Sequence, residues 1–312
     1  MNYVLLTLAA VMFAGQIVYT KFYQARSGGS RRASFLYPVL AGGISTLFFL
    51  CLNGFHVEVS GFSVLMAALL AFFTSVTVVL GVVAVSYGRM AVYSLFLMLG
   101  GMLLPFCYGL IFLNEELSVC RGIGVVLLVV SLILPVLKGG EKQAGGNKKI
   151  FILLCLFIFL CNGGTSIVSK VHAIDPRATG TNDFLILAFA FVTVISAAVY
   201  GVFALTQRKK QPLAESVPSL PESAQAAQKF GKKTLLLLLA FVAGYAISNG
   251  LGAMLQLICA ESVPASALYP FTSGGTVVLS TIAGRIIFRE KLSPLVLAGI
   301  ALAFVATVLF VF

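Results

Sequence analysis

The stretch Ser266-Ala-Leu-Tyr-Pro-Phe-Thr-Ser-Gly-Gly-Thr276, with the turn Phe288-Arg-Glu-Lys-Leu-Ser293 that follows it, decides how the chain is organised, because an earlier segment repeats its skeleton. Glu115-Glu-Leu-Ser118 aligns with Glu290-Lys-Leu-Ser293 at an offset of 290 − 115 = 175 residues. The matching pairs at this offset include Phe96 and Phe271, Gly100 and Gly275, Gly109 and Gly284, and Gly124 and Gly299. Such a repeat indicates a duplication and constrains the whole fold.

The composition is that of a membrane protein. Apolar residues make up 60% of the chain and charged residues only 10%, and the mean hydropathy is +1.05. The apolar runs are roughly 18–25 residues long, which suits helices that cross a hydrocarbon core of about 30 Å and does not suit the short alternating strands of a barrel. We therefore expect an all-α integral membrane protein.

Ten apolar runs are bounded by charged residues, Gly or Pro, and each is long enough to cross the membrane. They lie at about 3–20, 34–52, 61–85, 91–113, 119–137, 150–168, 184–205, 234–258, 265–288 and 294–312. The sequence therefore predicts ten transmembrane helices, with antiparallel neighbours wherever the connection is short.

A second match sets the start of each half. Gly15-Gln-Ile-Val-Tyr-Thr-Lys21 lies over Gly164-Thr-Ser-Ile-Val-Ser-Lys170. We expect a first five-helix repeat at 1–138, a flexible basic linker at 139–149, and a second five-helix repeat at 150–312 with a mobile polar loop at 207–233. Because five is odd, the two repeats would cross the membrane in opposite senses, and inverted repeats are a transporter architecture with the substrate site between the halves.

Taken together, these features resemble the drug/metabolite transporter superfamily, specifically its EamA-like ten-helix branch. The shared features are the Gly-containing first helix that ends in Lys, the fourth helix with Pro and Gly, the Glu-x-Leu-Ser turn and the Gly-containing fifth helix. The resemblance implies a multi-pass transporter in the cell (inner) membrane of a bacterium. It implies alternating access for a small organic metabolite, and it names no particular substrate.

Polar residues fall at helical spacing on several of the predicted helices, and polar stripes facing lipid would be costly. The predicted substrate-binding residues are Gln16, Tyr93, Asn162, Thr165, Tyr245, Asn249, Gln256, Tyr269, Thr272 and Ser273. A cavity of tyrosines and amides suits a neutral or zwitterionic solute. The alternative for Ser and Thr is a packing role that lets helices approach closely.

Pro and Gly interrupt the predicted fourth and ninth helices. Hinge candidates are Gly100, Pro105, Pro270, Gly274 and Gly275. Corresponding breaks in two halves of a transporter point to the substrate site. The alternative is a static kink in which a neighbouring Ser or Thr satisfies the freed carbonyl.

Four charges lie at matching helix ends. Lys21 and Lys170 are expected to snorkel to the membrane interface. Glu115 and Glu290 are expected to act as helix caps or loop locks. No Asp or Glu lies deep in a predicted helix. Small multidrug relatives in the family that the chain resembles carry a carboxylate eight residues before the lysine that ends their first helix, and the corresponding positions here are Phe13 and Asn162. The resemblance therefore disfavours carboxylate-based proton antiport.

Other functional classes receive little support from the sequence. The histidines, His56 and His172, are placed in predicted loops, and the sequence has no HExxH, GxSxG, Walker or CxxC pattern, so we expect no enzyme. The six cysteines have no metal-binding spacing, so we expect no metal, and we expect no cofactor. The net charge of +11 lies between the apolar runs, which favours orientation signals over nucleic-acid binding.

The expected partners are a small-molecule substrate and the lipid bilayer, and a homodimer is compatible with the sequence. The alternative function is a scaffold or sensor that recruits a partner through the loop at 207–233.

The distribution of basic residues predicts the orientation. The connections at 21–33, 86–90, 138–149, 206–233 and 285–293 hold eighteen of the 21 Lys and Arg residues, and three remain on the other side. The positive-inside rule therefore places both termini outside. EamA-like proteins usually have both termini in the cytoplasm, with basic residues at the places where this chain has Asn53–Ser60 and Val311-Phe312.

Overall fold

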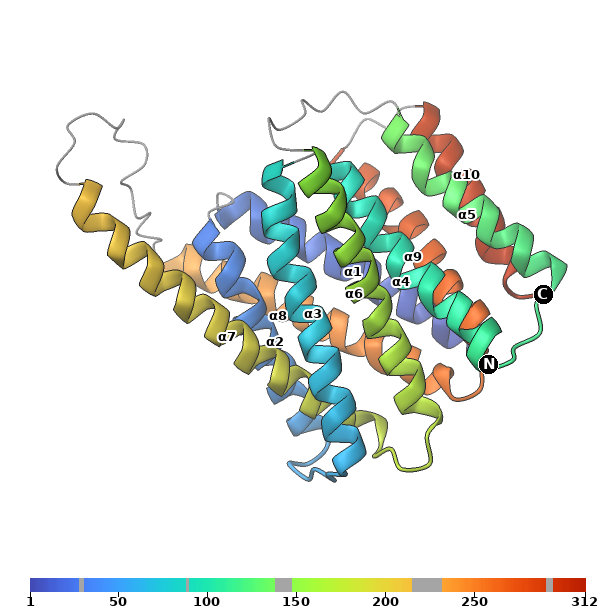
Figure 1. Cartoon of the computed structure of the whole chain (residues 1–312), viewed down its shortest axis with the longest axis horizontal. Coiled ribbons are helices and arrows are strands. Elements are labelled where there is room, and N and C mark those ends of the chain that lie inside the picture. Colours follow the sequence, from blue (N-terminus) through green and yellow to red (C-terminus); the bar gives the residue numbers. More distant parts are fainter. Residues whose placement is uncertain (28–30, 88–89, 138–147, 215–231, 290–293) are drawn as a thin grey trace.

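The computed structural model describes all residues except 28–30, 88–89, 138–147, 215–231 and 290–293. The described part contains ten helices (Figure 1). They are α1 (Asn2–Ser27), α2 (Arg31–Leu52), α3 (Gly61–Tyr87), α4 (Met90–Phe112), α5 (Val119–Leu137), α6 (Lys148–Ile174), α7 (Thr181–Ala214), α8 (Lys232–Ala260), α9 (Ala265–Ile287) and α10 (Pro294–Leu309).

Seven of the described helices are long and apolar enough to cross a membrane, namely α1, α2, α3, α4, α6, α7 and α8. The apolar parts of α5 and α10 are shorter. Helix α9 is long, but it carries many hydroxyl groups, and most of its first half is buried. It packs against α1, α4 and α10, so its polar groups are shielded from lipid by neighbouring helices.

The helices pack across the two halves of the chain. The most extensive contacts join α1 to α8, α2 to α7, α4 to α6, α10 to α5 and α3 to α6. Helices α5 and α10 lie side by side at one end of the bundle, and α7 lies toward the other end (Figure 1). Near the two termini, the Tyr3 hydroxyl donates to the carbonyl of Phe310 at 3.1 Å.

Small residues allow α4 and α6 to approach closely. A Cβ atom added to Gly100 would collide with the carbonyl oxygen of Phe159, and one added to Gly163 would collide with the Leu104 side chain. Without a hydrophobic driving force between helices in lipid, such close approach provides much of the packing energy. This pair of glycines therefore fixes α4 against α6.

The turns after α4 and α9 share a backbone conformation. Asn114 has φ 52° and Arg289 has φ 53°, and these positions are 289 − 114 = 175 residues apart. Asn adopts this left-handed region more readily than most residues, whereas a bulky residue such as Arg rarely does. In the first turn the Glu115 amide donates to the Gly109 carbonyl at 3.1 Å, which closes the end of α4.

Several helices are longer than the sequence predicted. Helix α7 continues to Ala214, so residues 207–214 of the predicted mobile loop are helical. Helix α6 begins at Lys148, inside the predicted linker, and continues to Ile174, so His172 is helical and buried and does not lie in a loop. Residues 138–147 and 215–231 lie outside the described part.

Candidate solute-binding site

A cavity of about 900 Å³ lies among α1, α2, α3, α4, α6, α7 and α8. Its described lining contains no Asp, Glu, Lys, Arg or His. The hydroxyl and amide groups that line it belong to Thr20, Tyr23, Gln24, Ser27, Ser34, Tyr37, Ser45, Thr74, Ser75, Tyr93, Thr165, Ser169, Ser196, Tyr245, Asn249 and Gln256. The described lining is therefore mainly apolar, and its polar groups are uncharged.

Three tyrosines form one wall of the cavity. The rings of Tyr23 and Tyr37 are 4.6 Å apart between centroids, and those of Tyr37 and Tyr245 are 5.0 Å apart. The hydroxyls of Tyr37 and Thr20 are hydrogen-bonded at 3.1 Å. The wall combines aromatic faces with hydroxyl groups, which is a surface that a planar polar molecule can contact.

Ser75 and Asn249 are among the cavity side chains that have no hydrogen-bond partner among the described residues. Ser75 is 6% exposed, and its Oγ is buried without a partner. Asn249, on α8, also makes no hydrogen bond within the described part and lines the cavity. A buried polar group without a partner is costly, so the buried Ser75 hydroxyl is available to a bound solute. The Asn249 amide is partly buried and is available as well.

Five predicted residues line this cavity: Tyr93, Thr165, Tyr245, Asn249 and Gln256. Gln256 is also tied to the neighbouring helix, because its Nε2 donates to Thr272 Oγ1 at 2.9 Å. Tyr93 packs against Gly81, where a Cβ atom would meet the tyrosine hydroxyl at 2.6 Å.

The other five predicted residues do not line the cavity, namely Gln16, Asn162, Tyr269, Thr272 and Ser273. Asn162 Nδ2 donates to the Leu97 carbonyl at 2.7 Å, and the Tyr269 hydroxyl donates to the Ser166 carbonyl at 2.6 Å. The hydroxyl of Thr272 donates to the Leu268 carbonyl at 2.9 Å. For these three residues the helix backbones satisfy the polar groups that the sequence assigned to substrate.

In α4, a side chain from α6 replaces the backbone hydrogen bond that Pro105 cannot make. Pro105 has no amide hydrogen to donate to the Gly101 carbonyl, and Ser166 Oγ donates to that carbonyl at 3.2 Å. This is the static arrangement that the sequence left open as the alternative to a hinge. In α9, Pro270 is buried, and a Cβ atom on Gly274 would collide with Thr307, whereas one on Gly275 would meet only Ala10, at 3.0 Å.

Two of the helix-end charges hold the turn between α8 and α9. Glu115 accepts hydrogen bonds from the amides of Ala265 and Ser266 at 2.6 and 2.8 Å, at the start of α9. Lys170 Nζ donates to the carbonyls of Ala260 and Val263 at 2.6 and 2.9 Å, at the end of α8. An anion at a helix N-terminus and a cation at a C-terminus both complement the helix dipole.

Lys170 therefore does not snorkel to the interface, because only 4% of the residue is exposed and its ammonium is bound by carbonyls. Lys21, at the matching position of α1, is partly buried, with its ammonium 5.4 Å from the centroid of the Phe288 ring. Glu290 lies outside the described residues.

Sequence reasoning missed the contribution of α2 and α7 to the site. Tyr37, Ala41 and Ser45 share one face of α2, and Leu185, Ala188, Phe189, Val192 and Ser196 share one face of α7. The period-of-four spacing of Tyr37 and Ser45 could have revealed the face on α2. The face on α7 has a single hydroxyl among apolar residues, so it cannot be distinguished from a packing surface.

Comparison with known proteins supports the fold alone. No protein-family model and no curated protein matches the chain. A solved structure described only as the crystal structure of a protein has a TM-score of 0.70 to this chain. The match covers 98% of this chain and 95% of the other, at 15% sequence identity.

Proposed function

We propose that this protein is a membrane transporter for a small organic solute without net charge. The observation that carries the proposal is a cavity of about 900 Å³ inside a bundle of apolar helices, where uncharged hydroxyl and amide groups lie among apolar side chains. Its volume falls within the range of about 300–1,000 Å³ that is typical of small-molecule sites. A net charge placed among neutral hydroxyls and amides would lose its hydration without gaining an ion partner, so the lining favours neutral solutes, with zwitterions as the second class.

Two internal correspondences support the proposal of inverted repeats. Exchange of the halves converts the α1–α8 contact into the α6–α3 contact, and it leaves the α2–α7, α4–α9 and α5–α10 contacts unchanged. The left-handed residues Asn114 and Arg289 are also separated by the repeat offset. Membership of the EamA-like branch of the drug/metabolite transporters is proposed on the sequence motifs together with these correspondences.

The cavity is open at one end. Gln24 and Ser34 line it and are exposed, and they flank the connection between α1 and α2. We call this side the basic face, since the connections there carry most of the Lys and Arg residues. At the other side, the opposite face, Lys170 and Glu115 hold the α8–α9 turn. We assign this arrangement to one access state of an alternating-access cycle, with the basic face in the cytoplasm.

Thermal stabilisation by solutes tests the binding step. A ligand that binds only the folded protein raises the melting temperature by mass action. We expect some uncharged metabolites to stabilise the purified wild type, and Asn249→Leu to weaken this stabilisation. Stabilisation by charged metabolites alone, or equal stabilisation of wild type and variant, would contradict the proposal.

A further inference from the structure

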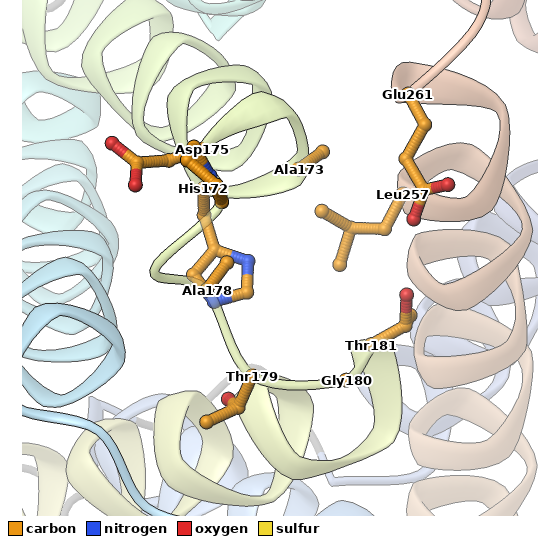
Figure 2. A pocket seen from close by; sticks show the side chains of 10 residues that line it. His172, Ala173, Asp175, Ala178, Thr179, Gly180, Thr181, Leu257 and Glu261 are labelled. Atoms are coloured by element: carbon orange, nitrogen blue, oxygen red, sulfur yellow. The ribbon is translucent and has the colours of Figure 1, made fainter.

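A second, smaller pocket of about 310 Å³ lies at the opposite face. It is built from the end of α6, the connection to α7 and the end of α8 (Figure 2). Pro176, Gly180 and Glu261 line it and are exposed, so it reaches the surface. The main cavity reaches the surface at Gln24 and Ser34, at the other end of the bundle.

Leu257 lines both pockets. It is 5% exposed and packs in an apolar cluster with Phe184 and Leu185. Its side chain extends from α8 toward the pocket, across from His172 and Ala173 (Figure 2). Among the described residues, Leu257 alone lines both spaces, so its side chain lies on the boundary between them.

The wall across from Leu257 is rigidly held. His172 is 2% exposed, its ring stacks on Phe184 with centroids 3.7 Å apart, and its Nε2 is hydrogen-bonded to Ser63 Oγ at 3.0 Å. The Ser63 hydroxyl also accepts the Thr179 amide at 2.9 Å, which fixes the α6–α7 connection.

Leu257 lies one helical turn before the end of α8, where Lys170 binds the backbone. The carbonyl of Ala260 accepts a hydrogen bond from Lys170, and the next helix is capped by Glu115. Movement of the α8–α9 turn would therefore require release of the Lys170 and Glu115 bonds and would carry Leu257 with it. The same hydrogen bonds therefore hold the α8–α9 turn at the opposite face and keep Leu257 between the two pockets.

We propose that the smaller pocket is the opposite-face mouth of the solute path, and that Leu257 is the barrier between it and the main cavity. This inference rests on the proposed transport function. The mouth would admit the same uncharged solutes and would repel anions, because Glu261 lines it. Asp175 contributes less, since its carboxylate points away from the pocket (Figure 2). Hydrogen bonds from Arg177 hold the pKa of Asp175 at about 2, so the two form an ion pair.

Thiol labelling tests the barrier without knowledge of the substrate. The six native cysteines are replaced by alanine, and a reporter, Ser169→Cys, is placed in the main cavity. A membrane-impermeant methanethiosulfonate reagent is applied in turn to each face, with right-side-out and inside-out vesicles. Thr181→Cys reports access to the smaller pocket and Thr20→Cys reports access from the basic face.

We expect Leu257→Ala to accelerate labelling of Ser169→Cys from the face that labels Thr181→Cys, by about ten-fold. The matched control is Ile186→Ala, because Ile186 is buried in the same cluster but lines neither pocket, and it should leave this rate unchanged. An unchanged rate in Leu257→Ala, or equal acceleration in both variants, would overturn the proposal.

A second variant covers the case in which Leu257→Ala does not fold. Leu257→Cys should react with reagent from either face, whereas Leu185→Cys should react only from the basic face. Reaction of Leu257→Cys from a single face would overturn the proposal. Solute uptake into liposomes is measured separately, so accelerated labelling without any uptake would retain the barrier and reject the transport function.

Discussion

At the scale of single residues, two asparagines of the same chain have different surroundings. Both Asn162 and Asn249 lie in apolar helices, and the sequence placed both in the substrate site. The structure gives Asn162 a backbone partner on α4, the Leu97 carbonyl, whereas Asn249 faces the cavity without a partner in the described part. Which asparagine is satisfied depends on the neighbouring helix, and that contact is not encoded in local spacing.

Asn249→Leu should therefore affect solute binding and leave the fold intact. Loss of a hydrogen-bonding group that holds the solute should cost about 1–3 kcal/mol of binding, which appears as a raised KM for uptake. The melting temperature without solute should change little. Unchanged KM in a well-folded variant would remove Asn249 from the site.

Tyr269→Phe should have the reverse effect. The Tyr269 hydroxyl donates to the Ser166 carbonyl and lies outside the cavity, so its removal should cost about 1 kcal/mol of stability without a change in KM. Thermal unfolding in detergent and uptake kinetics measure the two quantities. A raised KM with normal stability would return Tyr269 to the substrate site.

At the scale of elements, the α8–α9 turn depends on a residue that is distant in sequence. Glu115 caps α9 from the connection after α4, and the turn that presents it uses the left-handed Asn114. Room for the carboxylate comes from Gly109, where a Cβ atom would lie 2.5 Å from Glu115 Oε2. The sequence predicted a cap or a loop lock for Glu115 but could not identify its helix, because that helix begins 150 residues later.

Glu115→Ala should destabilise the protein by about 1–3 kcal/mol, since it leaves two helix N-terminal amides without their acceptor. Thermal unfolding measures the loss. Glu116→Ala is the matched control, because no hydrogen bond joins the Glu116 side chain to the described residues. If both variants were equally stable, the capping role of Glu115 would be wrong.

Gly100→Ala tests the crossing of α4 and α6. The added methyl group would collide with the Phe159 carbonyl, and backbone cannot move aside cheaply, so overpacking should cost about 1–3 kcal/mol or more. Gly122→Ala is the control, because a Cβ atom there meets nothing within 4 Å. A well-folded Gly100→Ala protein of normal stability would favour the hinge interpretation over tight packing.

The number and order of helices could be predicted from the lengths of the apolar runs, because each run must bury its backbone in lipid or protein. Helix ends were less predictable. Helix α6 continues past the apolar run because Lys170 and His172 find partners inside the protein, at the α8 carbonyls and at Ser63. Polarity alone does not end a helix where neighbouring helices satisfy the polar groups.

At the scale of the whole molecule, the predicted orientation determines on which side of the membrane the cavity opens. The cavity opens on the basic face, which the positive-inside rule places in the cytoplasm. A reporter that works only outside the cytoplasm should therefore be active when it is fused after Phe312. Activity of a cytoplasmic reporter at that end, with protease cleavage between α7 and α8 from outside intact cells, would reverse the orientation.

The most direct test of the central claim is solute uptake by purified protein in liposomes. A mixture of uncharged and charged metabolites is supplied outside, and mass spectrometry identifies those that enter. The account predicts that a small set of uncharged solutes enters faster with wild type than with lipid alone, and that Asn249→Leu reduces this uptake. No protein-dependent entry of any solute, or entry that is the same for wild type and Asn249→Leu, would contradict the account.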